Sequence, residues 1–519
     1  MASTFFGLTI AYSGLQAAQT SLTVAGHNIS NINTEGYSRQ QAETYASRAI
    51  RTYATYGTLG SGVTVGSINQ LRDSYYDVKY RNNQSNNGEY ATKSNYMNQV
   101  EDYLNEFILE GFTTEYRNFY EAVNQLTITP GDASSKNQLI NNGKSFADYL
   151  NTLCTNLRNV QEDINNEVKD TVERINSIAK NIAAINRQIN QIEANFGNAN
   201  DLRDKRNAMV DELSELVNID TTEEQMGNDL TNYTIRINGQ SLVSGYSYNT
   251  LEVVSREDPR NITDADGLYD ITWNSGQPFD IYSDTLGGSL RGLIDMRDGC
   301  NGEIESIATD EAGNFLYDSD GNRYNATTDT PKDNTEYKGV PYYQARLNKF
   351  AHIFAEAVND ILKSGYSSDG QHKGVSLFVT QNNTSSMTAS NITVNYDLLK
   401  NPDLLAIKSM VNTGESNADI MEQLNALQTA KIFDNGVATY YLETMVSDMS
   451  IDTQKASNLL KNHENLKTSI HNQRLSVMGV DTDEEAMDLM KFQEAYELSS
   501  KMLSVMNQIY DKLINQTGV

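Results

Sequence analysis

The chain has 519 residues, of which 38% are hydrophobic and 21% are charged. Its 40 basic and 68 acidic residues give a formal net charge of −28 at pH 7. A balance this negative repels nucleic acid and anionic lipid, and so argues against both as primary partners. The length is typical of about three domains and is enough to bury a sizeable core.

Targeting signals and cysteine chemistry are both scarce in this sequence. No Lys or Arg precedes Arg39, so the basic region of a cleavable signal peptide is missing. No run of about 20 apolar residues is present, so we expect no membrane span. Cys154 and Cys300 lie far apart, which argues against a disulfide framework and a CxxC metal site.

Both ends of the chain carry apolar residues at alternating spacings of three and four. This spacing predicts a helix at each end with a narrow coiled-coil seam. Gly26 and several polar positions interrupt the stripes, so neither helix is expected to be stable alone. The stripes are Phe5, Leu8, Tyr12, Leu15, Gln19, Leu22, Gly26 and Ile29 at the start, and Leu489, Phe492, Tyr496, Ser499, Leu503, Met506, Tyr510 and Leu513 at the end.

Two internal segments show the same helical pattern. Residues 147–192 contain isoleucines at seam spacing without Gly or Pro, and Gly143 and Gly197 bracket the segment. We predict one long helix there. Residues 456–477 predict a further seam that ends just before a glycine.

The middle of the chain, residues 233–394, alternates β-prone runs with turn signals. Such turn pairs between β-prone runs predict hairpins. One helix, at residues 343–363, is predicted to interrupt this region, and a smaller β excursion is predicted at residues 37–68. The turn pairs are Asn238-Gly239, Asp266-Gly267 and Asp320-Gly321.

These elements together predict a multidomain α+β protein. Its terminal coiled-coil helices would pair, an elongated helical bundle would form the body, and a mostly-β domain would be inserted in it. The expected parts are residues 1–34 with 483–519 for the terminal domain, 35–232 with 395–482 for the helical body, and 233–394 for the β insertion.

Fragments that resemble catalytic or metal-binding signatures fail on spacing. His463 begins an HExxH-like run, but Lys467 stands where the second zinc ligand is needed. The GKS at residues 143–145 lacks the earlier glycine of a phosphate-binding loop. The turns at residues 264–267 and 318–321 lack the further carboxylates of a calcium loop, which favours hairpin turns. We therefore expect no metal, no cofactor and no enzymatic activity.

One motif goes beyond what spacing alone explains. Residues 25–40 read AGHNISNINTEGYSRQ, which closely resembles the N-terminal signature of the hook-associated protein 1 family, one of the flagellar axial (rod, hook and hook-associated) families. Residues 57–81, 201–217 and 484–518 resemble later segments of the same family in the same order. The resemblance does not extend to residues 233–394.

The resemblance implies a structural protein of bacterial motility, secreted through the flagellar type III pathway to the hook–filament junction. The partners that it implies are further copies of the chain in a ring-like homo-oligomer, hook protein, hook-associated protein 3 and an export chaperone on the C-terminal helix. It implies neither nucleic acid nor membrane as a partner. Family members have termini that are disordered in the free monomer and fold on assembly, which is consistent with weak isolated helices.

Two sets of residues are the candidates for the assembly site. The first set would form the inner coiled-coil layer, and the second would shape the turn after the N-terminal helix, where Gly36 permits a backbone conformation that other residues resist. The first set is Phe5, Leu8, Leu15, Leu22, Ile29, Leu489, Phe492, Tyr496, Leu503, Met506, Tyr510 and Leu513, and the second is Asn28, Asn31, Gly36 and Tyr37.

Three alternatives stay open at this point. The protein could be another flagellar axial protein, such as hook protein or hook-associated protein 3, although the GYSRQ continuation and the isoleucine-rich helix favour the first family. It could be an exported adhesin or enzyme whose activity resides in residues 233–394. It could also be a cytoplasmic coiled-coil scaffold.

Overall fold

A computed structural model places most of the chain in helices and groups it into two compact units. Unit 1 comprises residues 1–86, 174–250 and 463–519, and unit 2 comprises residues 87–173 and 251–462. Each unit is therefore built from segments that lie far apart in the sequence. The residues that the structure describes are 6–51, 57–105, 111–195, 197–227, 230–257, 259–260, 264–299, 337–381, 387–411, 416–433 and 436–516.

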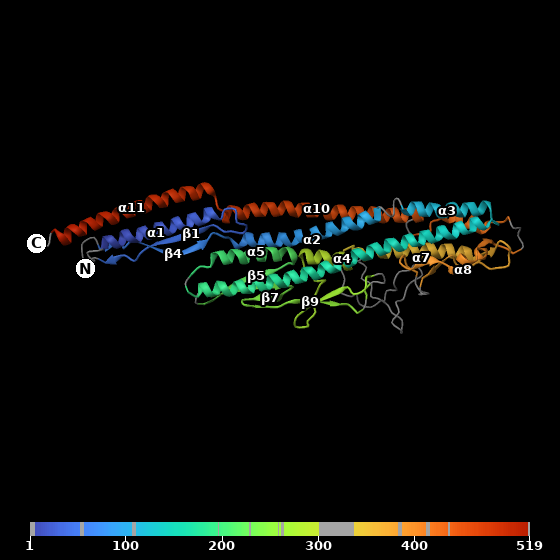
Figure 1. Ribbon diagram of the computed structural model, residues 1–519, viewed down its shortest axis with the longest axis horizontal. Coiled ribbons are helices and arrows are strands. Elements are labelled where there is room, and N and C mark those ends of the chain that lie inside the picture. The colour runs from blue at the N-terminus through green and yellow to red at the C-terminus, as the bar shows by residue number, and fades with distance from the viewer. Residues whose placement is uncertain are drawn as a thin grey trace. The chain divides into compact units, whose positions relative to one another are not determined.

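Unit 1 contains the two terminal helices. Helix α1 (Phe6–Ser30) and helix α11 (Thr482–Asn515) lie side by side, with both chain ends at the same end of the pair (Figure 1). Strands β1 (Gln40–Ala46) and β4 (Val63–Gln70) pair antiparallel next to α1. Two short strands, β2 (Ile50–Arg51) and β3 (Thr58–Leu59), extend this hairpin.

The rest of unit 1 combines helices with a small antiparallel sheet. Parts of α2 (Ser74–Leu104), α4 (Ala133–Glu193) and α10 (Ala438–Met478) belong to it, together with the whole of α5 (Asn200–Leu216). The sheet has the order β5-β6-β7-β8, and its strands are β5 (Asp220–Gly227), β6 (Leu230–Ile237), β7 (Gln240–Ser244) and β8 (Ser247–Tyr248).

Unit 2 surrounds an aromatic core. Phe119, Phe146, Phe350 and Phe354 are fully buried, and their rings lie 5.1–6.5 Å apart where they pair. The helices α3 (Thr113–Ile128), α4 and α7 (Val340–Ser364) supply these rings. The unit also contains the remaining parts of α2 and α10. Its other elements are α6 (Gly288–Asp298), α8 (Tyr396–Lys400) and α9 (Asp419–Ala426), the 3-10 turns Pro402–Leu404 and Leu427–Thr429, and the strand pairs β9 (Leu251–Ser255) with β10 (Tyr269–Trp273), β11 (Tyr366–Ser367) with β14 (Ala406–Lys408), and β12 (Phe378–Thr380) with β13 (Ile392–Val394).

The predicted fold class is confirmed: the protein is α+β, with long helices at both termini and small antiparallel sheets in the middle. The predicted long helix is also present, but α4 begins at Ala133 and runs through Gly143. Gly143 does not end the helix because its bare backbone faces the core. A Cβ atom placed there would lie 3.6 Å from Phe119, Leu377 and Val394.

The β-rich middle is organised differently from the expectation. The predicted helix at residues 343–363 is α7, but α6 is a second helix that the pattern did not indicate. Asn238-Gly239 does form a two-residue hairpin turn, with φ of 50° and 77°. Asp266-Gly267 instead forms a turn at the end of a long connection into β10, and Asp320-Gly321 lies outside the described residues.

The expected three-part division does not coincide with the two units. The sheet β5–β8 belongs to unit 1, whereas the later strands of residues 233–394 belong to unit 2. Side chains from the end of α4 hold the sheet there: Asn186 donates to the carbonyl of Gly245, and Asn190 donates to the carbonyl of Thr231.

Candidate functional site: the paired terminal helices and their anchor

Helices α1 and α11 pack antiparallel in one register along their length. A Cβ atom placed on Gly7 would lie 2.5 Å from Met506 Cε, and one on Gly14 would lie 3.0 Å from Ser499 Oγ. Further along the pair, Asn28 Nδ2 donates to Glu485 Oε1 at 3.1 Å. The helix axes can approach this closely because small residues repeat at heptad spacing on α1. This small-residue seam consists of Gly7, Ala11, Gly14, Ala18, Ser21, Ala25 and Asn28.

The predicted N-terminal stripe lies one position away from this seam. Leu8, Leu15, Leu22 and Ile29 are half-buried and flank the contact with α11, whereas Ala11 and Ala25 are 2% and 1% exposed. Their expected role in the inner coiled-coil layer of the assembly stays a prediction. Within the chain the contact is made by smaller residues, because leucines there would hold the helix axes further apart than Gly7 and Gly14 allow. Phe5 lies outside the described residues.

The predicted C-terminal stripe lies on the side of α11 that faces α1. Six of its members are half-buried there, whereas Tyr496 is 36% exposed and Leu513 is 53% exposed. The half-buried members are Leu489, Phe492, Ser499, Leu503, Met506 and Tyr510.

A second apolar stripe on α11 is exposed, and the sequence pattern did not single it out. From Leu498 onward its members are three or four residues apart, and a step of eight separates Leu498 from Met490. The signal was a series of Met, Leu, Val and Ile between the positions of the first stripe. This outer stripe consists of Met487 (59% exposed), Met490 (59%), Leu498 (65%), Met502 (40%), Val505 (53%) and Ile509 (48%).

The turn after α1 is held by the buried side-chain amide of Asn28. Its Nδ2 donates to the carbonyl of Gln40 at 2.9 Å, and its Oδ1 accepts from the Gln40 backbone N–H at 3.0 Å and from the Tyr37 hydroxyl at 2.8 Å. Gly36 adopts a φ of +77°, which glycine reaches without strain. Asn31 donates to the carbonyl of His27 and closes the end of the helix. All four predicted turn residues therefore shape this corner.

Tyr37 also lies beside negative charge. Burial is the main cause that raises the pKa of its hydroxyl well above the usual range, and the carboxylates of Asp201, Asp204 and Glu485 raise it further. The hydroxyl therefore stays protonated and remains a hydrogen-bond donor to Asn28.

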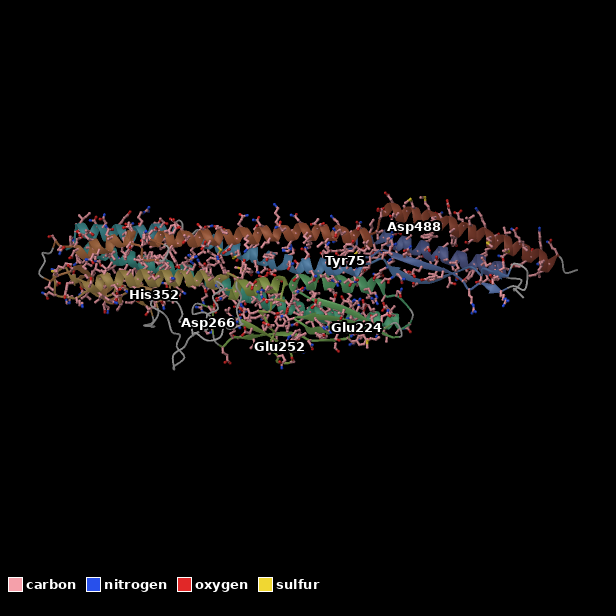
Figure 2. The ribbon with its side chains drawn as sticks, turned by 180° about the vertical axis from the view of Figure 1, so that it is seen from behind. Tyr75, Glu224, Glu252, Asp266, His352 and Asp488 are labelled. Carbon is pink, nitrogen blue, oxygen red and sulfur yellow. The ribbon has the colours of Figure 1, made fainter. Side chains whose placement is uncertain are left out.

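An ion cluster fastens the same corner to the start of α11. Arg39 Nε lies 2.6 Å from Glu485 Oε1, and Arg39 Nη1 lies 2.7 Å from Glu484 Oε2. Asp488, labelled on α11 in Figure 2, lies 3.5 Å from the same guanidinium. Burial lowers the pKa of Arg39, but the bonds with Glu485 and Glu484 outweigh it, so the net pKa is raised. The backbone N–H of Arg39 donates to Met478 at the end of α10.

A second polar cluster joins the motif to α2 and α5. Ser38 donates through its N–H and its hydroxyl to Asp204, at 3.0 and 2.7 Å. Arg72 pairs with Asp77 at 2.7 Å and with Asp204 at 3.4 Å. Burial raises the pKa of Asp204 although Ser38 and Arg72 act in the opposite direction. Three of the four sequence segments that resemble one family thus meet in space at residues 38, 72 and 204.

The packing between α1 and α11 is incomplete. A cavity of about 360 Å³ lies between α1, β1 and α11, and Ala18, Ser21 and Phe492 are among its lining residues. Small side chains on α1, such as Ala18 and Ser21, are too short to fill this space.

The described residues offer no site for metal chemistry and no helix that could span a bilayer. Within the described ranges, no group of three His, Cys, Asp or Glu side chains is placed to hold a metal ion. No described helix is long and apolar enough to cross a membrane. Asp264 accepts a hydrogen bond from Gln161, and Asp266 accepts one from Arg158.

Family models match three parts of the chain. The model described as flagellar hook-associated protein FlgK helical domain matches residues 97–378. The model of flagella basal body rod protein matches residues 8–37, and that of flagellar basal body rod FlgEFG protein C-terminal matches residues 471–516.

The full-length relatives that the chain resembles are also flagellar proteins. Flagellar hook-associated protein 1 of Bacillus subtilis (strain 168) is 27% identical over 531 residues, covering 100% of this chain and 99% of the relative. The Escherichia coli (strain K12) protein of that name is 26% identical over 560 residues, covering 97% and 98%. The structure of the flagellar hook junction protein FlgK from Burkholderia pseudomallei matches with a TM-score of 0.58 at 13% identity, covering 77% of this chain and all of that one, which supports the fold.

Proposed function

The chain belongs to the flagellar hook-associated protein FlgK family, and on that premise we propose how it is built into the flagellum. It is a structural component of the hook–filament junction, as its relatives are. We propose that it assembles through α1 and α11, which become fully ordered only when further copies cover their outer faces.

The weak pairing of α1 and α11 supports this mechanism. Among the described residues of α11, Glu485 is the one buried residue. An isolated chain therefore gains little hydrophobic stabilisation from pairing these helices. Long helices in water depend on such packing rather than on their own propensity. Disorder of the ends before assembly follows from the same small gain.

The outer stripe of α11 carries the proposal. Leu498, Val505 and Ile509 are each about half exposed or more. Burying a side chain of this kind completely contributes about 1.5–3 kcal/mol. A neighbouring copy that covers the stripe would supply the stabilisation that the pair lacks. We propose the predicted apolar residues of α1, Leu8, Leu15, Leu22 and Ile29, as the matching surface.

The remaining partners follow from the position at the junction. We propose hook protein on one side of the ring and hook-associated protein 3 on the other, with an export chaperone on α11 before assembly. We propose no enzymatic activity, because the relatives are named as flagellar hook-associated proteins.

The test combines a gene deletion with one charged substitution. Deletion should leave cells with bare hooks and with flagellin lost to the medium. Complementation with Leu498→Asp should fail to restore filaments, while the purified variant keeps the wild-type melting temperature because Leu498 is 65% exposed. Ser500→Asp, which adds the same charge at an exposed polar position, is the control and should restore filaments.

Two results would contradict the proposal. Intact filaments in the deletion strain would remove the junction role. Normal filaments with Leu498→Asp would remove the outer stripe as the assembly surface. Leu503→Asp is a poorer test, because Leu503 is half-buried against α1 and its loss also weakens the pair within the chain.

A further inference from the structure

Unit 2 holds a buried cluster of a lysine, an aspartate and a glutamate. Lys93 Nζ on α2 lies 2.6 Å from Asp295 Oδ2 on α6 and 2.5 Å from Glu89 Oε1. The three side chains are 5%, 2% and 16% exposed. The ring of Tyr337 covers the ammonium, with its centroid 4.4 Å from Nζ. The nitrogen of a lysine and the oxygens of two carboxyl groups thus lie within hydrogen-bonding distance of one another, away from water.

The backbone holds these groups together. Gly292 lies one turn before Asp295 on α6, and a Cβ atom placed there would lie 2.6 Å from the carbonyl oxygen of Glu89 and 2.9 Å from Thr92 Cβ. The absence of a side chain therefore lets α6 lie directly on α2. Groups fixed in such a geometry react as if at very high concentration.

We propose that Lys93 and Asp295 condense into an amide, so that unit 2 forms its own covalent cross-link between α2 and α6. Glu89 accepts a proton from the ammonium and passes it to an oxygen of Asp295, and the freed amine then attacks Cγ of the neutral carboxyl group. A C–N bond forms and a C–O bond breaks. The two protons lost by the nitrogen leave with the carboxyl oxygen as one water molecule, and Glu89 returns to its carboxylate form. Neither an oxidant nor a reductant is needed.

Arg291 supplies the stabilisation that the intermediate requires. Its Nε lies 3.0 Å from Asp295, where negative charge grows on the carboxyl oxygen during attack. After condensation, Glu89 and Arg291 remain as opposite charges, so the cluster stays neutral.

The resting cluster is an ion triad, so Lys93 is charged before the reaction. Burial lowers the pKa of Lys93, but the carboxylates of Asp295 and Glu89 outweigh it and raise the pKa. The reaction must therefore begin with proton transfer to Glu89. Buried ion pairs carry a large desolvation cost, which a neutral amide avoids. Because the geometry exists only in the folded unit, the bond forms only after folding.

The experiment is the intact mass of the purified full-length chain. Folded protein should be lighter than its sequence mass by one water molecule, and chain kept in denaturant from synthesis onward should have the full mass. Proteolysis of the folded sample should yield a branched peptide that joins Lys93 to Asp295. Lys93→Arg and Asp295→Ala should both restore the full mass, and Glu89→Gln should slow or stop the loss on refolding.

An internal control comes from a second buried lysine. Lys136 Nζ lies 2.8 Å from Asp403 Oδ1, but the Asp403 side chain is 68% exposed, so their peptides should be recovered unlinked. Full sequence mass in folded, aged wild-type protein would overturn the proposal, whether or not any variant folds. Loss of water mapped to a single peptide, as in a succinimide at an Asp-Gly pair, would overturn it as well.

Discussion

Asn28 donates a hydrogen bond to Glu485 across 457 residues of sequence, at 3.1 Å. The same side chain bonds the backbone of Gln40 in both directions and accepts from Tyr37. One amide therefore joins the end of α1, the turn after it and the start of α11. The corner at which the terminal helices meet the rest of unit 1 is specified by hydrogen bonding, whereas the helices beyond it are held by small side chains.

Replacement of Asn28 by aspartate should open this corner. Asn28→Asp removes the two N–H donors and places a second carboxylate beside Glu485, so we expect a loss of about 2–4 kcal/mol in the pairing of α1 and α11. Hydrogen exchange of the amides in α1 and α11 should accelerate, with little change in unit 2. Asn33→Asp, at an exposed position of the same turn, is the control and should leave exchange unchanged.

Enlarging a residue of the small-residue seam should separate the terminal helices. Ala11 is 2% exposed and does not line the cavity beside α11, so Ala11→Leu overpacks the contact with α11 at a cost of about 1–3 kcal/mol. Limited proteolysis should cut α1 and α11 faster than in the wild type. Thr23→Leu places a leucine on the exposed face instead and should have no such effect. Equal resistance of Ala11→Leu and wild type would show that α1 uses a different face.

Gly143 offers a test of packing inside unit 2. A Cβ atom there would make ordinary contacts at 3.6 Å, so Gly143→Ala should stabilise the unit by about 0.5–1 kcal/mol through better helix propensity. Gly143→Leu has no room among Phe119, Leu377 and Val394 and should destabilise by about 1–3 kcal/mol. Urea midpoints of the two variants should therefore lie on opposite sides of the wild type. Shifts of the same sign would contradict this packing.

Unit 2 should lose stability in acid because of Asp298. Burial alone would raise the pKa of this carboxyl, but Arg297 at 2.7 Å and Arg256 at 2.6 Å hold it well below its usual range. The unfolded chain, with a pKa of about 3.9, therefore binds the proton more readily than the folded chain. The stabilisation is fully present above about pH 4 and is lost as the pH falls further.

Urea unfolding between pH 6 and pH 2 measures this effect. Asp298→Asn should be less stable than wild type at pH 6 by about 3–5 kcal/mol, because two buried arginines lose their partner, and should depend less on acid. Asp266→Asn is the control, since its side chain is 97% exposed and its acid dependence should match wild type. If the free energy of unfolding of Asp298→Asn fell with pH as steeply as that of wild type, Asp298 would not be the source of the acid sensitivity.

The sequence predicted the helices well and their contacts less well. Periodicity located α4, α7 and the two terminal helices, because burial of one face imposes a spacing that the sequence must show. It did not locate the start of α4, since a glycine inside a helix has the same local appearance as one that ends it. Gly143 is explained by Phe119 and Val394, which come from other parts of the chain.

The choice of face on α1 was also beyond a one-dimensional pattern. Leu8 and Leu15 are the more hydrophobic stripe, and hydrophobicity alone selects them over Gly7 and Gly14. Close approach of two helices favours the smaller side chains, and that preference appears only when the partner helix is in place. From Leu498 onward the outer stripe of α11 has the same spacing of three and four as the inner one, so periodicity could not show which of them the chain itself covers.

By itself, the sequence determined the helical ends, the negative surface, the turn residues and the family. These depend on local spacing, charge and short motifs, which neighbouring residues carry on their own. Tertiary structure alone decided that Asn28 meets Glu485, that Ser38 meets Asp204 and that Lys93 meets Asp295. Each of these pairs joins segments more than a hundred residues apart, and the folded backbone brings them together because burial and hydrogen bonding act across space rather than along the chain.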